Sequence, residues 1–136
     1  MPGDSGPGRG RGIKLRRPGR PMLSDEERAR VVEFILAGRA EEALEAVCRA
    51  HGRSPPRLRV GRVNGHSKAL AVYDPRSETI FVSDGSLLRD PFVPLHEVYH
   101  HLRMLAGRRR GTERHADRFA LSLIEAYLRL RGSSLG

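Results

Sequence analysis

Two histidines and a glutamate in the C-terminal half have the types and spacing that can hold and use a zinc ion. Residues 96–101 read HEVYHH, which contains the pattern H-E-x-x-H. On a helix, His96 and His100 lie one turn apart on the same face, so both imidazoles can reach one metal. Glu97 is rotated by about 100° from His96 and can address a metal-bound water without taking a coordination position. The pattern therefore predicts hydrolytic chemistry with Glu97 as the catalytic residue.

Apolar residues at three-and-four spacing predict that the motif lies on a helix. Asp90 is suited to cap this helix, with Pro91 at the first helical position. Pro94 lacks an N–H, so we expect the regular helix to begin nearer Val93. Gly107 suits the C-terminal stop, and residues 108–111 read as an exposed turn. The apolar positions are Phe92, Val93, Leu95, Val98, Leu102 and Leu105.

A catalytic zinc site needs a third protein ligand and an open position for water. A second helix is predicted from Thr112 to Arg129, and its apolar face, projected back, contains Glu113 and Asp117. Two carboxylates on the buried side of a helix are costly unless a charged group compensates them. We therefore expect Glu113 to be the third ligand of one zinc ion per chain, and Asp117 to orient a ligand histidine. The apolar face runs through Ala116, Ala120, Leu123, Ile124 and Tyr127.

The pair of motifs resembles a known family. H-E-x-x-H followed by E-x-x-x-D is similar to the gluzincin metallopeptidases, and residues 113–120 (ERHADRFA) resemble the E-x-x-A-[DN]-x-F-A segment of the ImmA/IrrE-type peptidases and minigluzincins. The resemblance covers roughly half of the chain, from about Arg57. It implies a zinc-dependent peptidase that cleaves regulatory or DNA-binding proteins. It also implies that such an enzyme can be latent, with a segment such as 1–22 or 132–136 blocking the cleft.

The chain departs from the family pattern at Tyr99, where a small residue is common, and at His101, an added histidine beside the motif. Tyr99, His101 and His115 are candidates for contacts to a substrate or an oxyanion. His101 and His115 are also ordinary packing or surface residues on a simpler interpretation.

Other interpretations of the same pattern stay open. The histidines could be helix residues without a metal, and a zinc ion could be purely structural. Glu113 could be a solvated carboxylate that the helix dipole favours. Asp117 could pair with Arg114 or Arg118.

Positive charge is concentrated at the N-terminus. The formal net charge is +9, and residues 1–21 have six basic residues against one acidic residue, a net charge of +5. This Arg/Gly/Pro segment has little to bury, so we expect it to be disordered and able to bind nucleic acid through phosphate attraction. The alternative function is a basic nucleic-acid-binding or regulatory module with a structural or degenerate zinc site. The candidate contacts are Arg9, Arg11, Arg16, Arg17 and Arg20.

Composition indicates one modest domain. The chain has 136 residues and a single cysteine, Cys48, which lies in an apolar stretch and reads as a packed thiol. No apolar run is long enough to span a membrane, and no apolar signal region is present at the N-terminus. We expect a cytoplasmic protein with a protein or peptide substrate and no membrane partner.

The remaining elements predict an α+β fold. Ser24-Asp25-Glu26-Glu27 is a capping box before an apolar helix that ends near Gly38. A helix over 40–50 and strands over 57–63, 68–73 and 79–82 follow, separated by turns at 64–65 and 74–77. We expect a disordered tail (1–22), a minimal zincin-like domain (23–131) in which a three-stranded twisted sheet covers two packed helices, and a flexible end (132–136).

Overall fold

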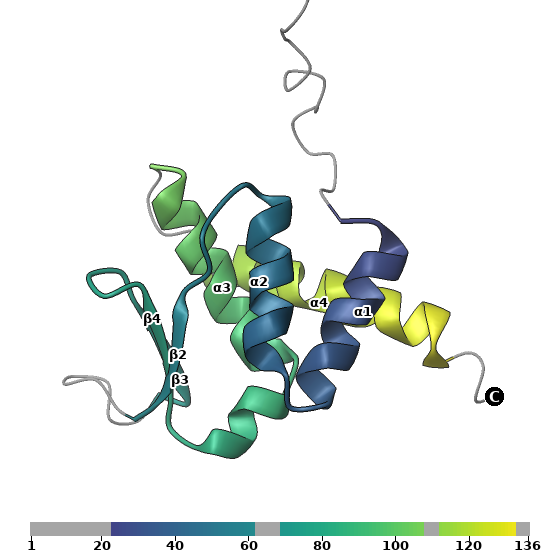
Figure 1. The fold of residues 1–136 in the computed structure, drawn as a ribbon, viewed down its shortest axis with the longest axis horizontal. Helices are drawn as coiled ribbons and strands as arrows, with labels where there is room; N and C mark the ends of the chain where they lie inside the picture. Colours follow the sequence, from purple (N-terminus) through teal and green to yellow (C-terminus); the bar gives the residue numbers. More distant parts are fainter. Residues whose placement is uncertain (1–22, 62–68, 108–111, 133–136) are drawn as a thin grey trace, which may run out of the picture.

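The computed structural model describes residues 23–61, 69–107 and 112–132. Within them the chain folds as an α+β domain that combines helices with a small mixed sheet (Figure 1). In chain order the elements are α1 (Asp25–Leu36), α2 (Ala40–Ala50), β2 (Arg57–Val60), β3 (Ala71–Asp74), β4 (Thr79–Val82), the 3₁₀ helix η2 (Gly85–Arg89), α3 (Phe92–Leu105) and α4 (Glu113–Leu130).

The three strands pair in the order β2-β4-β3. β2 runs parallel to β4, with Leu58 opposite Ile80, and β3 runs antiparallel to β4, with Tyr73 opposite Ile80. The sheet lies on one side of the molecule, and the helices lie together beside it (Figure 1). Among the described strands, β3 is an edge strand. It contacts α3, the helix that carries the histidines.

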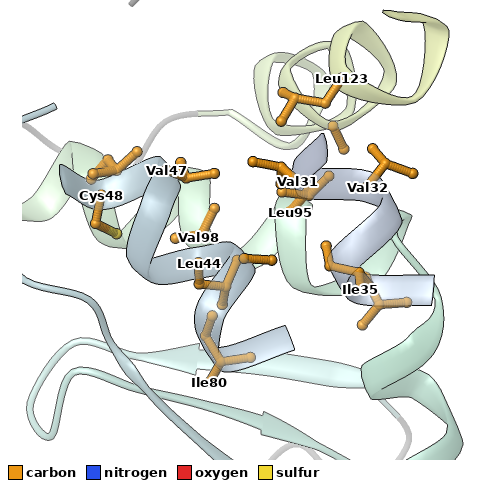
Figure 2. Packing of buried hydrophobic residues seen from close by; sticks show 14 of the residues in the cluster. Val31, Val32, Ile35, Leu44, Val47, Cys48, Ile80, Leu95, Val98 and Leu123 are labelled. Carbon is orange, nitrogen blue, oxygen red and sulfur yellow. The ribbon is translucent and has the colours of Figure 1, made fainter. Parts of the chain in front are cut away.

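One apolar core joins every layer. Figure 2 shows Ile80 of the sheet directed toward side chains of α2 and α3, with side chains of α1 and Leu123 of α4 completing the cluster. α4 crosses behind α1 (Figure 1) and packs against both α1 and α3. Burying these side chains is the main favourable contribution to folding, and it fixes α3 between the sheet and α4. The residues labelled in the cluster are Val31, Val32, Ile35, Leu44, Val47, Cys48, Ile80, Leu95, Val98 and Leu123.

Several predicted element boundaries are confirmed. The capping box is formed: the Glu27 N–H donates to Ser24 Oγ at 3.1 Å, and the Ser24 N–H donates to Glu27 Oε1 at 2.8 Å. The helix over 40–50 and the strand over 79–82 have the predicted bounds. Gly38 and Gly107, after α1 and α3, adopt the positive φ angles of +83° and +77° that a helix-terminating glycine provides.

Other boundaries differ. α3 begins at Phe92, so Pro94 is its third residue, where an N–H would have no partner within the helix anyway. The N-cap is Pro91 rather than the predicted Asp90, whose carboxylate accepts from the Phe92 N–H at 3.0 Å. β2 ends at Val60, whereas the predicted strand extended to residue 63, and β3 begins at Ala71, whereas the predicted strand began at residue 68. The 3₁₀ helix η2 was not predicted.

Some predictions concern residues outside the described part. These are the disordered basic tail with its five arginines, the turn at 64–65, the turn at 108–111 and most of the C-terminal end. Across the described residues, no helix has both the length and the apolar character needed to cross a membrane.

Candidate metal centre

α3 presents two imidazoles side by side. His96 and His100 are one helical turn apart, and their ring centroids lie 5.3 Å apart with a steep interplanar angle of 71°. The His100 side chain is only 1% exposed and that of His96 is 12% exposed. The core anchors the helix through Leu95 and Val98, so the two rings are held where α4 crosses.

α4 brings a carboxylate to both rings. Thr112 caps this helix by accepting the His115 N–H at 3.1 Å, which places Glu113 in the first turn. Glu113 Oε1 lies 2.6 Å from His96 Nε2, and Glu113 Oε2 lies 3.1 Å from His100 Nε2. One ligand atom from each of the three residues lies within 4.8 Å of the other two. This group could hold a metal ion.

Asp117 contacts the other side of the His96 ring. Its Oδ1 lies 2.9 Å from His96 Nδ1, one turn along α4 from Glu113. With a metal bound, a hydrogen bond from Nδ1 to this carboxylate would favour the tautomer in which Nε2 carries a lone pair. Nε2 lies on the side where Glu113 and His100 converge.

The donor chemistry of the group fits a cation. An ionised carboxylate can only accept hydrogen bonds, so the 2.6 Å contact between Glu113 Oε1 and His96 Nε2 needs a proton on Nε2, and a metal ion bound by both atoms would replace that proton and hold the two atoms farther apart. His96 already directs Nδ1 at a second carboxylate. The Glu113 side chain is 69% exposed, which leaves one side of the group open to solvent. Two imidazole nitrogens and one carboxylate oxygen are a donor set that can bind a metal ion, and the exposed side leaves room for a further ligand.

The exposure of the two carboxylates corrects one prediction. Glu113 and Asp117 were expected on the buried side of the helix, but their side chains are 69% and 48% exposed. The reason is that α4 begins beyond the edge of the core, and its apolar contacts start at Ala116. The argument from buried charge therefore does not hold, although both residues do face the histidines.

Glu97 lies beside the group and outside it. Its side chain is buried, 8% exposed, and it lines a pocket of about 290 Å³ together with His96. Among the described residues, the other walls of the pocket are Leu70, which directly precedes β3, Ala71 at the start of β3, and Phe92 and Val93 at the start of α3. A small molecule or side chain in this pocket would touch both a metal-ligand candidate and the glutamate of the motif.

His101 lies outside the metal group. His101 is fully buried, its Nδ1 lies 2.8 Å from the Tyr73 hydroxyl, and its Nε2 lies 2.8 Å from the Ser54 carbonyl oxygen. A carbonyl only accepts, so Nε2 carries the proton and the Tyr73 hydroxyl donates to Nδ1. Because position 101 is rotated by about 100° from His100, its ring faces the sheet rather than the metal group.

The other two candidates serve packing and capping contacts. Tyr99 is half-buried, with its ring 5.7 Å from that of His100 and 5.8 Å from that of Phe119 on α4. His115 is exposed, as expected, and its Nδ1 lies 2.8 Å from Thr112 Oγ1. Tyr99 thus supports the packing of α3 on α4 beside a ligand candidate.

Sequence reasoning missed the residues outside the two motifs that line the pocket beside Glu97 or, in the case of Tyr73, hold the motif helix through His101. The sequence placed Leu70 and Tyr73 on a predicted strand and Phe92 on a predicted helix. It indicated no role at the site for any of the three. Tyr73 and Leu70 lie next to the motif helix only because β3 packs beside α3. No local signal in the sequence specifies this position of β3. Comparison with protein-family models, with curated proteins and with solved structures gives no match.

Proposed function

We propose that this protein is a zinc-dependent metallopeptidase in which His96, His100 and Glu113 hold the zinc. The observation that carries the proposal is the convergence of both Nε2 atoms on the Glu113 carboxylate, with Glu97 buried next to them on the same helix. Nitrogen and carboxylate ligands in this number, with an open side, suit zinc. The resemblance to the gluzincins, stated above on residues 96–100 and 113–117, supports the same assignment.

The chain's own residues then have distinct roles. Zinc bound here would lower the pKa of a bound water and polarise the scissile carbonyl. Glu97 would accept the proton from the attacking water and deliver it to the leaving amine. Asp117 would hold the His96 ring in the orientation that directs Nε2 at the metal. The buried position of Glu97 limits competing contacts with bulk water.

The edge strand offers a place for an extended substrate. β3 ends the described sheet, so the outer row of its backbone groups is available to a peptide that adds as a further strand. The pocket beside Glu97 begins at the N-terminal end of this strand, at Leu70 and Ala71. A peptide paired with β3 would therefore pass the metal group. Backbone pairing of this kind gives affinity with little dependence on sequence.

The natural substrate is proposed from resemblance and charge. ImmA/IrrE-type likeness and the net charge of +9 favour a regulatory or DNA-binding protein that the enzyme meets on nucleic acid. The same proposal includes latency, in which a chain end or a second copy of the protein covers the cleft.

The test combines metal content with a matched pair of variants. Tag-free protein purified without chelators should contain about one zinc per chain by elemental mass spectrometry, and His96→Ala should lose it. Glu97→Gln should keep the zinc and lower the rate of peptide hydrolysis by about 10²–10⁴-fold. Glu125→Gln makes the same substitution at an exposed position on α4. It should leave both the zinc content and the rate of peptide hydrolysis unchanged. Wild-type activity in Glu97→Gln would disprove the mechanism.

A second candidate function rests on the concentration of charge in residues 1–21. A nucleic-acid-binding module would show salt-dependent DNA binding that disappears when these residues are deleted. Zinc-loaded protein without hydrolytic activity toward any peptide mixture, together with such binding, would favour this function over the peptidase.

A further inference from the structure

The sheet has an outer face whose side chains differ from those on the face that packs on the core. Leu58 and Ile80 lie opposite each other on neighbouring strands, and both join the apolar core. Successive side chains of a strand point to opposite faces, so the next set of partners, Arg59, Phe81 and Val72, points away from the core. The described helices lie together on the core side of the sheet (Figure 1).

Phe81 is an aromatic residue in the middle of this outer face. It lies on β4, the central strand of the sheet, and it is half-buried, whereas its neighbours Ile80 and Val82 are fully buried. Among the described residues, Phe81 belongs neither to the apolar core nor to the side chains that pack against it. A ring that stays accessible and contributes to no core can stack on a flat ring of a ligand.

Two arginines of β2 stand on the same face as the Phe81 ring. Arg59 lies opposite Phe81, and Arg57 lies two residues earlier on the strand, which separates their Cα atoms by about 7 Å. Both are exposed, and within the described part of the chain neither guanidinium group has an ion-pair partner. Their spacing is comparable to the distance between successive phosphates on an extended nucleic-acid strand, and guanidinium groups bind phosphate through paired hydrogen bonds.

A polar pocket extends this positive row at the end of the sheet. Its volume is about 400 Å³, and its lining includes Arg57 together with Arg76 and Ser77 from the turn between β3 and β4. Two acidic residues lie at the same end: Glu78 also lines the pocket, and Asp74 accepts from the Ser77 hydroxyl at 2.7 Å and from the Arg76 backbone N–H at 3.2 Å. The two guanidinium groups of the pocket can receive one further phosphate group.

We infer that the outer face of the sheet binds a short segment of single-stranded nucleic acid. Phe81 stacks on one base, and Arg57 and Arg59 bind the phosphates beside it. A duplex offers no such contact, because its bases are stacked on one another inside the helix. The inference goes beyond the proposed peptidase and does not depend on it, since none of these residues belongs to the metal group. It also differs from phosphate attraction by residues 1–21, which contain no aromatic side chain that could stack on a base.

The experiment separates stacking on bases from attraction of phosphates. Fluorescence anisotropy measures the affinity of the full chain for a labelled oligothymidylate of about twelve nucleotides and for an abasic strand of the same length and charge. The oligothymidylate should bind about tenfold more tightly than the abasic strand. Phe81→Leu should remove this difference and leave the affinity for the abasic strand unchanged. Equal affinities of the wild-type chain for the two probes, or tighter binding of a duplex of the same length, would overturn the inference.

Two further variants show whether the ring of Phe81 is the group that matters. Phe81→Tyr keeps an aromatic ring on β4 and should keep the preference for the oligothymidylate. Phe34→Leu makes the same substitution as Phe81→Leu at a half-buried phenylalanine of α1, and it should leave both affinities unchanged. A preference that persists in Phe81→Leu, or one that is lost in Phe34→Leu as well, would place the contact with the base elsewhere and contradict the inference.

The salt dependence of binding tests the contact with phosphate. Arg59→Gln changes an exposed side chain, which the fold should tolerate, and it should weaken the binding of both probes. It should also reduce the slope of the logarithm of affinity against the logarithm of salt concentration by about 0.7, the value for one phosphate contact on a single strand. Arg30→Gln is the matched control, because the Arg30 side chain is 61% exposed on α1, and it should keep the wild-type slope. An unchanged slope in Arg59→Gln would show that β2 binds no phosphate and would contradict the inference.

Discussion

At the scale of single residues, the site depends on one carboxylate that faces two imidazoles and a second that faces one of them. The two oxygens of the Glu113 carboxylate contact the Nε2 atoms of His96 and His100. Asp117 contacts the Nδ1 atom of His96. The two acids are one helical turn apart, yet only Glu113 belongs to the group that could hold a metal. Different effects of the two substitutions on metal affinity are therefore expected.

Asp117→Asn should weaken zinc binding by about 10–100-fold while leaving the fold intact. The amide can present its NH₂ group to Nδ1 and favour the wrong tautomer of His96, which turns a proton rather than a lone pair toward the metal. The measurement is competition with a zinc chelator of known affinity, and Glu125→Gln serves again as the control. Unchanged affinity would mean that Asp117 does not set the His96 ring.

At the scale of elements, α3 is attached to its neighbours by a buried polar chain as well as by apolar packing. The Tyr73 hydroxyl on β3 donates to His101, which donates to the Ser54 carbonyl between α2 and β2. Burial raises the pKa of Tyr73 to about 12, so this hydroxyl keeps its proton at neutral pH. The chain thus links the edge strand, the motif helix and the preceding connection through neutral groups.

Tyr73→Phe should lower the free energy of unfolding by about 1–3 kcal/mol, because His101 Nδ1 would stay buried without a donor. Tyr127→Phe removes a hydroxyl from a half-buried tyrosine on α4 and should change stability by less than about 0.5 kcal/mol. Urea unfolding of both variants, compared at constant m-value, checks the difference. Equal stability of the two variants would argue against the hydrogen bond.

The sequence specified the helices better than the relations between strands. His96 and His100 could be placed together because a local period fixes their spacing, and Ser24 could be assigned as a cap for the same reason. The pairing of Tyr73 with His101, 28 residues away, depends on which strand forms the sheet edge. Strand order is set by packing of the whole chain, so neither this contact nor the pocket at Leu70 could be read from local patterns.

At the scale of the whole molecule, helices α1 and α4 are joined by an ion-pair cluster. Arg131, just after α4, donates to Glu33 Oε2 at 2.7 Å and to Glu26 Oε2 at 2.7 Å, both on α1. The hydrogen bonds from Arg131 lower the pKa of each carboxyl from its ordinary value of 4.5. Such a network, unlike a single surface pair, can contribute to stability.

The direction in which pH changes the stability follows from the lowered pKa values of Glu26 and Glu33. The stabilisation is fully present above pH 4.5 and is lost as pH falls through the lower pKa values of the folded state. Arg131→Gln should therefore reduce the melting temperature at pH 7 and flatten its decline between about pH 5 and pH 3. Thermal melts across this range test the expectation.

Arg49→Gln is the control for that experiment, since Arg49 pairs with Glu45 within a single exposed turn of α2 at 3.6 Å. It should leave the acid-dependent decline unchanged. Part of the decline should remain in Arg131→Gln as well, because the backbone hydrogen bond from Ser24 lowers the pKa of Glu27 independently. A decline identical to wild type in Arg131→Gln would exclude the cluster as its source.

The candidate metal ligands all lie between residues 96 and 113, on two consecutive helices, whereas the outer wall of the pocket and the edge strand come from residues 70–74. The candidate metal ligands and the edge strand are thus encoded in separate stretches of the chain. In the proposed peptidase, substitutions along the edge strand would change how a peptide pairs with it while the candidate metal ligands stay as they are. Such a division would favour divergence, because copies of one gene could acquire new targets without first losing the residues proposed to hold the metal.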